Sequence, residues 1–297
     1  MRHTPLAQAA TAAGLRVLEI EKINRPEGVA AIAELKPEVI AVVAFGQMVR
    51  AQVRDLAPLG AFNLHASLLP ELRGAAPINW AVIRGYKRTG VTTFSLVDAL
   101  DAGPMYVQAA MDVSVEETVE DLKPLLAAIG AKAVCETLDL LAGGRAMPQP
   151  QDDSKATLAP MLKKTDGMID WKAPAETIRN LIHGTWPWPA AQAVFQHADA
   201  PDKQIQVDIA RVRVDPGAML PSAEACRATV ALSGHAFKGG SLAPMAPGTV
   251  TADLTVAAGE GRLQILRIQP AGKRVMEWRD FVNGYRVRPG DRFVEKI

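Results

Sequence analysis

Asn63 and His65 stand two residues apart in a segment, 61–65, whose apolar and aromatic residues are typical of a buried strand. In a strand, residues i and i+2 lie on one face, so an amide and an imidazole would point into the same cleft. An amide donates a hydrogen bond to a developing oxyanion, and an imidazole transfers a proton near neutral pH. Asp101 could orient that imidazole or relay its proton through water. The alternatives are a polar strand end for the first two residues and an ordinary turn residue for Asp101.

The elements that must position these residues alternate along the first half of the chain. We expect helices at 5–14, 28–35, 51–56, 77–85 and 119–141, and strands at 15–20, 39–44, 61–65, 92–97 and 105–113. Alternation of this kind predicts an α/β fold, a Rossmann-like doubly wound parallel sheet with helices on both faces. In such sheets ligands bind beyond the carboxyl ends of the strands. Asn63–His65 and the segment 98–103 both lie at such ends, so we expect them to face one crevice.

The second half of the chain differs from the first in composition and in the pattern of expected elements. Residues 145–164 are rich in Pro, Gln, Asp and Lys and resemble a linker, and 175–183 is typical of a helix. Short β-like runs separated by Gly and Pro follow at 204–213, 228–232, 248–251, 255–257 and 262–268, which predicts a β-barrel or sandwich. We therefore expect a catalytic domain at 1–147, a linker and connecting helix at 148–189, and a C-terminal OB-like β-barrel at 190–297.

Composition favours a cytoplasmic protein with a local basic surface. The net charge is only +1, but residues 261–292 carry eight Lys and Arg against three Asp and Glu, an excess suited to an anionic partner or to a solvated barrel surface. Cys135 and Cys226 are far apart, which indicates reduced thiols. The sequence contains no run of 18 apolar residues and no secretory signal pattern.

Several common site types are not supported by the sequence. It has no Gly-x-Gly-x-x-Gly or Walker loop for a dinucleotide or ATP, and no serine nucleophile elbow. We interpret His3, His183, His197 and His235 as ordinary core or surface residues. Ser67-Leu-Leu-Pro70 is unusually apolar for a surface loop, so it is either a packed turn or the wall of a pocket for a flat ring.

Asn63-Leu-His65-Ala-Ser67-Leu68-Leu69-Pro70, with Asp101 downstream, resembles the formyltransferase family that uses 10-formyltetrahydrofolate. Four further stretches resemble the branch of that family that acts on methionyl-tRNA: Arg73-Gly-Ala-Ala-Pro-Ile78, Ile169-Asp-Trp171, Trp186-Pro-Trp-Pro189 and Ile268-Gln-Pro-Ala-Gly-Lys-Arg-Val-Met276. The resemblance covers nearly the whole chain, and the last stretch is the one most specific to that branch.

The resemblance implies transfer of a formyl group from 10-formyltetrahydrofolate to the α-amino group of methionyl initiator tRNA. It implies that Asn63, His65 and Asp101 are catalytic and that Ser67, Leu68, Leu69 and Pro70 line the folate pocket. No metal or covalent enzyme intermediate is required. The family's C-terminal barrel offers a basic surface to tRNA, for which we expect Arg73, Lys273 and Arg274 to serve. We expect a monomer without membrane association.

Two departures from the family pattern stand out. The family begins with a strand bearing a Gly-Thr-Pro-type turn, a helix, a second strand and a basic loop, whereas this chain starts at Met1-Arg-His-Thr-Pro5, after that unit of roughly 30 or more residues. We expect a misassigned or deleted start, hence an N-terminally truncated relative. Pro104 also replaces a residue that is usually acidic or polar.

Two alternatives remain. One is a formyltransferase acting on a small amine, such as an amino sugar or glycinamide nucleotide, against which the basic β-rich tail argues. The other is a non-catalytic tRNA-binding remnant, which would bind tRNA without binding folate.

Overall fold

The computed structural model describes residues 4–215 and 245–295. Two compact units are built from interleaved chain segments. The first comprises 1–65, 93–107 and 133–151, and the second comprises 66–92, 108–132 and 152–297. The expected strand at 228–232 lies outside the described residues.

The first unit contains the helices α1 (Pro5–Ala12), α2 (Pro26–Ala33) and α3 (Ala51–Arg54) and the strands β1 (Ile40–Val43) and β2 (Ala61–His65). Both α1 and α2 begin with proline, whose fixed φ suits the first helical position. β1 and β2 are parallel, with Ile40 opposite Ala61 and Val43 opposite Leu64. Ile23, Val49 and Val53 form the buried core beside them.

A four-stranded sheet has the order β1-β2-β3-β4, with β3 at Arg88–Ser95 and β4 at Met105–Asp112. β4 runs antiparallel to β3, because Ser95 N–H donates to Pro104 O and Val113 N–H donates to Lys87 O. The connection 96–104 is too short for the crossover that a parallel pair needs. The expected α/β fold class is confirmed, with a mixed rather than wholly parallel sheet.

The expected strand at 15–20 is wrong. These residues follow α1 as an irregular segment, and Leu15, Val17 and Leu18 are 64%, 38% and 40% exposed. Alternation alone suggested a strand, but the segment pairs with none of the described strands.

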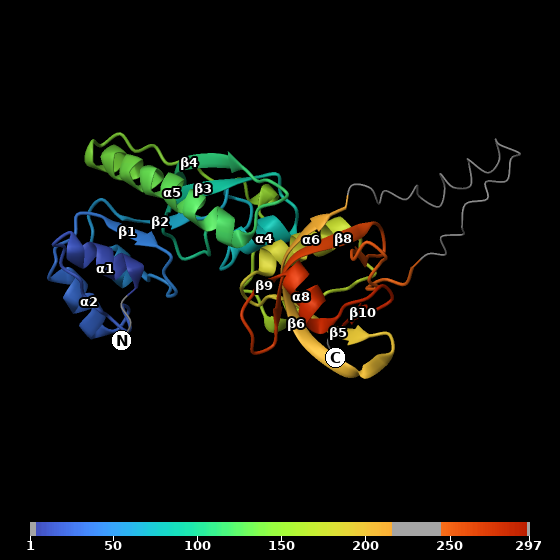
Figure 1. The fold of residues 1–297 in the computed structure, drawn as a ribbon. Helices are drawn as coiled ribbons and strands as arrows, with labels where there is room; N and C mark the ends of the chain where they lie inside the picture. The colour runs from blue at the N-terminus through green and yellow to red at the C-terminus, as the bar shows by residue number, and fades with distance from the viewer. Residues whose placement is uncertain (1–3, 216–244, 296–297) are drawn as a thin grey trace, which may run out of the picture. The chain divides into compact units, whose positions relative to one another are not determined.

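The second unit contains α4 (Pro77–Ile83), α6 (Ala175–Thr185) and α8 (Trp278–Tyr285), whereas α5 (Val119–Ala142) runs through both units. Its strands are β5 (Ala191–His197), β6 (Ala200–Val214), β7 (Val256–Ala257), β8 (Arg262–Pro270), β9 (Met276–Glu277) and β10 (Arg292–Val294). They form an antiparallel sheet of order β10-β5-β6-β8-β7, with β9 on β8. Figure 1 labels β5, β6, β8, β9 and β10 of this sheet.

This sheet is nearly closed into a barrel. Thr249 bridges to Arg292 at the start of β10, and Val250 bridges to Val256 in β7, so one short segment joins both edges of the sheet. Inside, Phe195 lies 5.4 Å from Phe281 and 5.3 Å from Phe293 between ring centroids. The expected C-terminal barrel is therefore confirmed.

Helix α6 packs against both α4 and strand β6. Ile178 and Ile182 are buried in the barrel core, while Asn79 Nδ2 donates to Gly184 O at 2.8 Å on the α4 side. A Cβ on Gly184 would meet Ile83 Cγ1 at 2.4 Å, so this close helix contact needs glycine. Among the described helices, none is long and apolar enough to cross a membrane.

Candidate active site

Strand β2 presents Asn63 and His65 on one face at its carboxyl end. His65 is 5% exposed, and its ring makes an edge-on contact with Phe94 on β3, with centroids 6.4 Å apart. Asn63 is half-buried. The imidazole therefore has a restricted orientation, and the amide beside it reaches the surface.

Asp101 lies in the loop that follows β3, as expected. Its backbone is left-handed, with φ 49°, a conformation that aspartate tolerates better than most residues. The loop is tightly folded, since a Cβ on Gly103 would lie 1.7 Å from Ser95 O. Gln151 Nε2 donates to both Asp101 O and Gly103 O at 2.8 Å.

The His65 and Asp101 side chains meet in the first unit. Nδ1 of His65 lies 3.7 Å from Oδ2 of Asp101, and the side chains are 6% and 13% exposed. This separation is within ion-pair range but longer than a direct hydrogen bond. The pair can hold an imidazolium next to a carboxylate, and Asn63 adds an amide donor on the same strand face. That arrangement suits proton transfer coupled to oxyanion stabilisation.

The segment Ser67–Pro70 follows β2 directly. Ser67 is fully buried and Leu69 is 3% exposed, whereas Leu68 and Pro70 are half-buried. Ser67 Oγ donates to Glu71 O at 2.6 Å, so this hydroxyl holds the loop's own backbone. Leu68 and Pro70 therefore offer the loop's accessible apolar surface.

Thr92 and Gln108 hold this segment in place, and neither residue was predicted from the sequence to do so. Thr92 Oγ1 donates to Ser67 O at 2.7 Å and accepts from Leu69 N–H at 3.1 Å. Gln108 Nε2 donates to Leu69 O at 2.8 Å and to Thr92 Oγ1 at 3.0 Å. Strand-like stretches supplied both residues, so only the three-dimensional pairing reveals their role.

The three basic residues expected at a tRNA surface differ in accessibility. Arg73 has an 11% exposed side chain, and its Nη2 lies 2.6 Å from Asp153 Oδ1. A phosphate would therefore compete with that carboxylate. Lys273 and Arg274 are exposed in the turn between β8 and β9.

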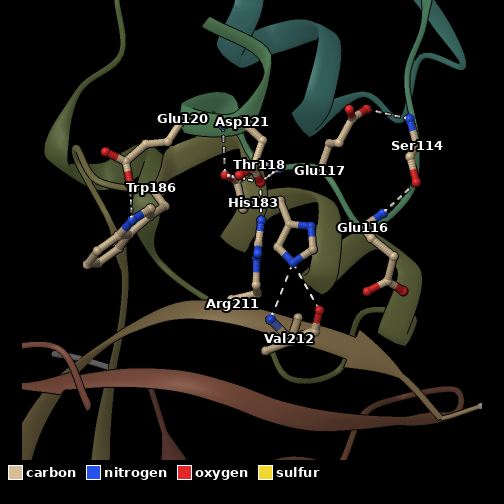
Figure 2. Close-up of polar contacts among 10 residues, drawn as sticks. All are labelled: Ser114, Glu116, Glu117, Thr118, Glu120, Asp121, His183, Trp186, Arg211 and Val212. Atoms are coloured by element: carbon tan, nitrogen blue, oxygen red, sulfur yellow. Dashed lines mark hydrogen bonds and ion pairs between the residues drawn. The ribbon is translucent and has the colours of Figure 1, made fainter. Parts of the chain in front are cut away.

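A second polar cluster joins residues 114–121 to α6 and β6 (Figure 2). Arg211 pairs with Asp121, Arg213 Nε lies 3.3 Å from Glu116 Oε2, and Trp186 Nε1 donates to Glu120 Oε2 at 2.8 Å. Each basic or indole group thus has an acidic partner, so this cluster fastens the barrel to the first turn of α5 and to the chain segment just before that helix.

His183 lies at the centre of that cluster, 1% exposed, with Nε2 at 3.0 Å from Val212 O and 3.3 Å from Val212 N. Burial lowers the pKa of His183 to about 4, and the charges of Arg211 and Arg179 act in the same direction. The imidazole is therefore neutral at pH 7, which fits its interpretation as an ordinary core residue. Within 4–215 and 245–295, no group of three or more His, Cys, Asp or Glu is arranged to hold a metal ion.

Comparison with known proteins agrees with this layout. Residues 4–138 match the family model described as "Formyl transferase", and residues 161–286 match "Formyl transferase, C-terminal domain". The methionyl-tRNA formyltransferase of Solibacter usitatus is 38% identical over 292 residues, which cover 98% of this chain and 85% of that protein. The enzyme of the same name from Pelobacter propionicus is 37% identical, covering 96% of this chain and 81% of that one.

The chain belongs to the methionyl-tRNA formyltransferase family. The expected family is confirmed, and the protein is a transferase.

Solved structures show that the fold extends beyond this family. HypX from Aquifex aeolicus, solved in complex with tetrahydrofolic acid, superposes with a TM-score of 0.61 at 15% identity, covering 88% of this chain and 41% of that one. An N-formyltransferase from Helicobacter canadensis, in complex with folinic acid and dTDP-3-aminofucose, gives a TM-score of 0.58 at 14% identity over 91% and 82% of the two chains. These similarities establish the fold alone.

In this member of the methionyl-tRNA formyltransferase family, Gln151 was not predicted from the sequence to belong to the site. It lies in the stretch interpreted as linker, where Pro and Gln suggested irregular structure. The stretch is instead fixed to its surroundings, because Met105 and Gln149 exchange two backbone hydrogen bonds of 2.8 Å. The one sign in the sequence was that Gln151, a polar residue, lies two positions after Gln149, which pairs with Met105.

Proposed function

We propose that this protein transfers a formyl group from 10-formyltetrahydrofolate to the α-amino group of methionine on initiator tRNA. The observation that carries the proposal is the His65–Asp101 pair, 3.7 Å apart, with Asn63 on the same face of β2. Membership of the methionyl-tRNA formyltransferase family supports the choice of substrate.

In the proposed reaction the methionyl nitrogen attacks the formyl carbon attached to N10 of the folate. A new C–N bond forms, and the carbonyl oxygen becomes an oxyanion to which the Asn63 amide donates. His65, with Asp101, accepts the proton that leaves the amine and returns one to N10 as the C–N10 bond breaks. Atoms and charges balance without any further reactant.

Residues Ser67–Pro70 are proposed to line the folate site. Leu68 and Pro70 support this role with half-buried apolar side chains directly after His65 in the chain, a surface suited to a flat ring. The division into a catalytic domain at 1–147, a connecting part at 148–189 and a tRNA-binding barrel at 190–297 belongs to the same proposal, as do a monomeric state and a cytoplasmic location.

The test is formylation of methionyl-tRNA by the purified protein and its variants. We expect His65→Ala and Asp101→Ala each to lower kcat/KM at least about 100-fold, the scale of a lost acid/base group. Asn63→Ala should cost a similar factor, as loss of one oxyanion donor does.

Two residues provide matched controls. Asp98 is in the same loop as Asp101 but is 90% exposed and pairs with Arg54, and His197 pairs with Asp291 in the barrel. Asp98→Asn and His197→Asn should keep near-normal rates. Near-normal rates for His65→Ala and Asp101→Ala would overturn the site. Preference for an amino sugar or a glycinamide nucleotide over methionyl-tRNA in competition would overturn the substrate.

A further inference from the structure

The backbone of the Asp101 loop is held by a side chain from a distant part of the sequence. Gln151 Nε2 makes two 2.8 Å hydrogen bonds, one to the carbonyl of Asp101 and one to that of Gly103. A primary amide carries two N–H bonds on one nitrogen, so a single Gln151 can supply both.

Gln151 is itself held in place. Two residues earlier, Gln149 pairs with Met105 through two backbone hydrogen bonds, and Met105 begins β4 immediately after the loop. The second half of the loop is therefore held by the Gln151 side chain, at Asp101 and Gly103, and the residue that follows the loop is held by the backbone of the same segment.

The backbone conformation of the loop at Asp101 depends on contacts from the residues around it. Asp101 has a left-handed backbone, φ 49°, which is sparsely populated for residues other than glycine. Such a conformation persists where surrounding contacts determine it. From this backbone position the Asp101 carboxylate lies 3.7 Å from the His65 imidazole.

We propose that Gln151 is a positioning residue that sets the Asp101 carboxylate against His65. This inference rests on the proposed function for its effect on rate. Its effect on geometry is independent of that function. A displacement of about 1 Å at a reacting group can lower a rate about 100-fold.

The experiment compares Gln151→Met, which keeps the length of the side chain but removes both donors, with Gln149→Met. Among the described residues, the Gln149 side chain donates only to nearby Met147 O, at 3.2 Å, and its backbone pairing survives the substitution. We expect Gln151→Met to lower kcat by about 10–100-fold, with the KM for folate and tRNA changed less than about threefold, and Gln149→Met to leave both unchanged. Gln151→Glu places a carboxylate opposite two carbonyl oxygens and should lower kcat further.

A double-mutant cycle separates positioning from a general structural effect. In an Asp101→Ala background, Gln151→Met should cause no further loss, because the carboxylate that it positions is gone. An equal loss in both backgrounds would overturn the proposal, as would a kcat for Gln151→Met or Gln151→Glu within twofold of the unchanged protein.

A measurement that does not depend on turnover distinguishes the positioning role of Gln151 from the proposed function. The NMR signals of the His65 imidazole should shift in Gln151→Met and stay unchanged in Gln149→Met. If the unchanged protein does not formylate methionyl-tRNA, the proposed function fails, while a shifted His65 signal still supports the positioning role. Unchanged His65 signals in Gln151→Met overturn it.

Discussion

Asp101 and Ala190 share a left-handed backbone but differ in what compensates for it. Asp101 has a short polar side chain that tolerates this conformation, and Gln151 holds its carbonyl. Ala190, φ 65°, follows the Trp186–Pro189 stretch, is 3% exposed and has no polar side chain to offset the cost. We infer that the first conformation serves the site, whereas the second is a strained conformation that glycine would adopt more readily.

Replacing Ala190 with glycine should change stability little, although the alanine methyl group is buried. The left-handed conformation costs an alanine about 1–2 kcal/mol, which glycine relieves. Against this gain, glycine has more freedom in the unfolded chain, which costs about 0.4–1 kcal/mol, and the methyl group packed with Trp186 and Ala210 is lost, at about 0.8 kcal/mol. Denaturant unfolding of Ala190→Gly should therefore show a free energy of unfolding within about 1 kcal/mol of that of the unchanged protein.

Ala191 is the matched control for this substitution. It begins β5, is fully buried and pairs with Ile209. Glycine there removes a buried methyl group and weakens a strand, so Ala191→Gly should lower stability. Equal effects of the two substitutions would contradict the explanation from backbone strain.

At the scale of elements, strand β3 contains three buried threonines, and two of them, Thr89 and Thr92, differ in their hydrogen bonding. Thr92 Oγ1 joins Ser67 and Leu69 of the proposed folate loop, whereas Thr89 Oγ1 is buried without a hydrogen-bond partner among the described residues. The same substitution at the two positions therefore separates the hydrogen bonds from the shape of the side chain.

Thr92→Val should destabilise the protein by about 1–3 kcal/mol, because it leaves buried loop groups unsatisfied. The KM for the formyl donor should rise several-fold as the loop loosens. Thr89→Val should be neutral or slightly stabilising, since it removes an unpaired hydroxyl of the same shape. Thermal unfolding and steady-state kinetics measure both, and a Thr89→Val variant less stable than Thr92→Val would refute the assignment.

The stability of the protein depends on pH through His183, which lies in helix α6. Its pKa of about 4 in the folded protein, against 6.5 unfolded, means that only the unfolded state takes up a proton as the pH falls below 6.5. Stability is thus complete above pH 6.5 and is lost toward pH 4, by up to about 3 kcal/mol.

Unfolding of the unchanged protein and of His183→Gln between pH 7 and 4.5 tests this. The glutamine variant should lose less stability over that range, since an amide does not titrate. Asp121 contributes at lower pH. Its burial raises the pKa, but hydrogen bonds from Thr118 and the charge of Arg211 outweigh burial and lower it. Parallel curves for the two proteins would contradict the role of His183.

The sequence predicted elements best where one pattern dominated. The continuous β-branched run at 39–44 and the long helix after residue 119 were both found, as β1 and α5. Strand β5 was missed because two of its four buried residues, Ala191 and Ala193, are too small to mark a strand by hydrophobicity.

For the site, strand spacing predicted that Asn63 and His65 share a face, and the order of strands placed Asp101 nearby. Neither pattern could locate Gln151, Thr92 or Gln108. Their roles depend on hydrogen bonds across many residues of sequence, which no local periodicity records.

On the scale of the whole molecule, the basic excess between residues 261 and 292 contrasts with a net charge of only +1. Several of its arginines already face carboxylates, such as Arg262 with Asp253 and Arg267 with Glu277. Lys273 and Arg274 are exposed in the β8–β9 turn and are the proposed phosphate contacts.

The double variant Lys273→Ala/Arg274→Ala should weaken tRNA binding and reduce the slope of log K against log salt concentration by about 1–2, because up to two phosphate contacts are lost. Its single-turnover rate at saturating tRNA should be unchanged. Lys203→Ala, an exposed lysine on β6, is the control and should keep the full slope. An unaltered slope in the double variant would exclude this turn from the interface.

The position of α6 also limits how the chain can be divided. Ile178 and Ile182 complete the barrel core, and the opposite side of the same helix meets α4 through Asn79 and Gly184. Helix α6 thus packs against the barrel on one side and against α4 on the other. A fragment that begins at residue 190 would lack this helix and would expose the apolar core of the barrel. Chimaeras that exchange the barrel between relatives should therefore carry α6 with it, and grafts should be matched at the α4 surface.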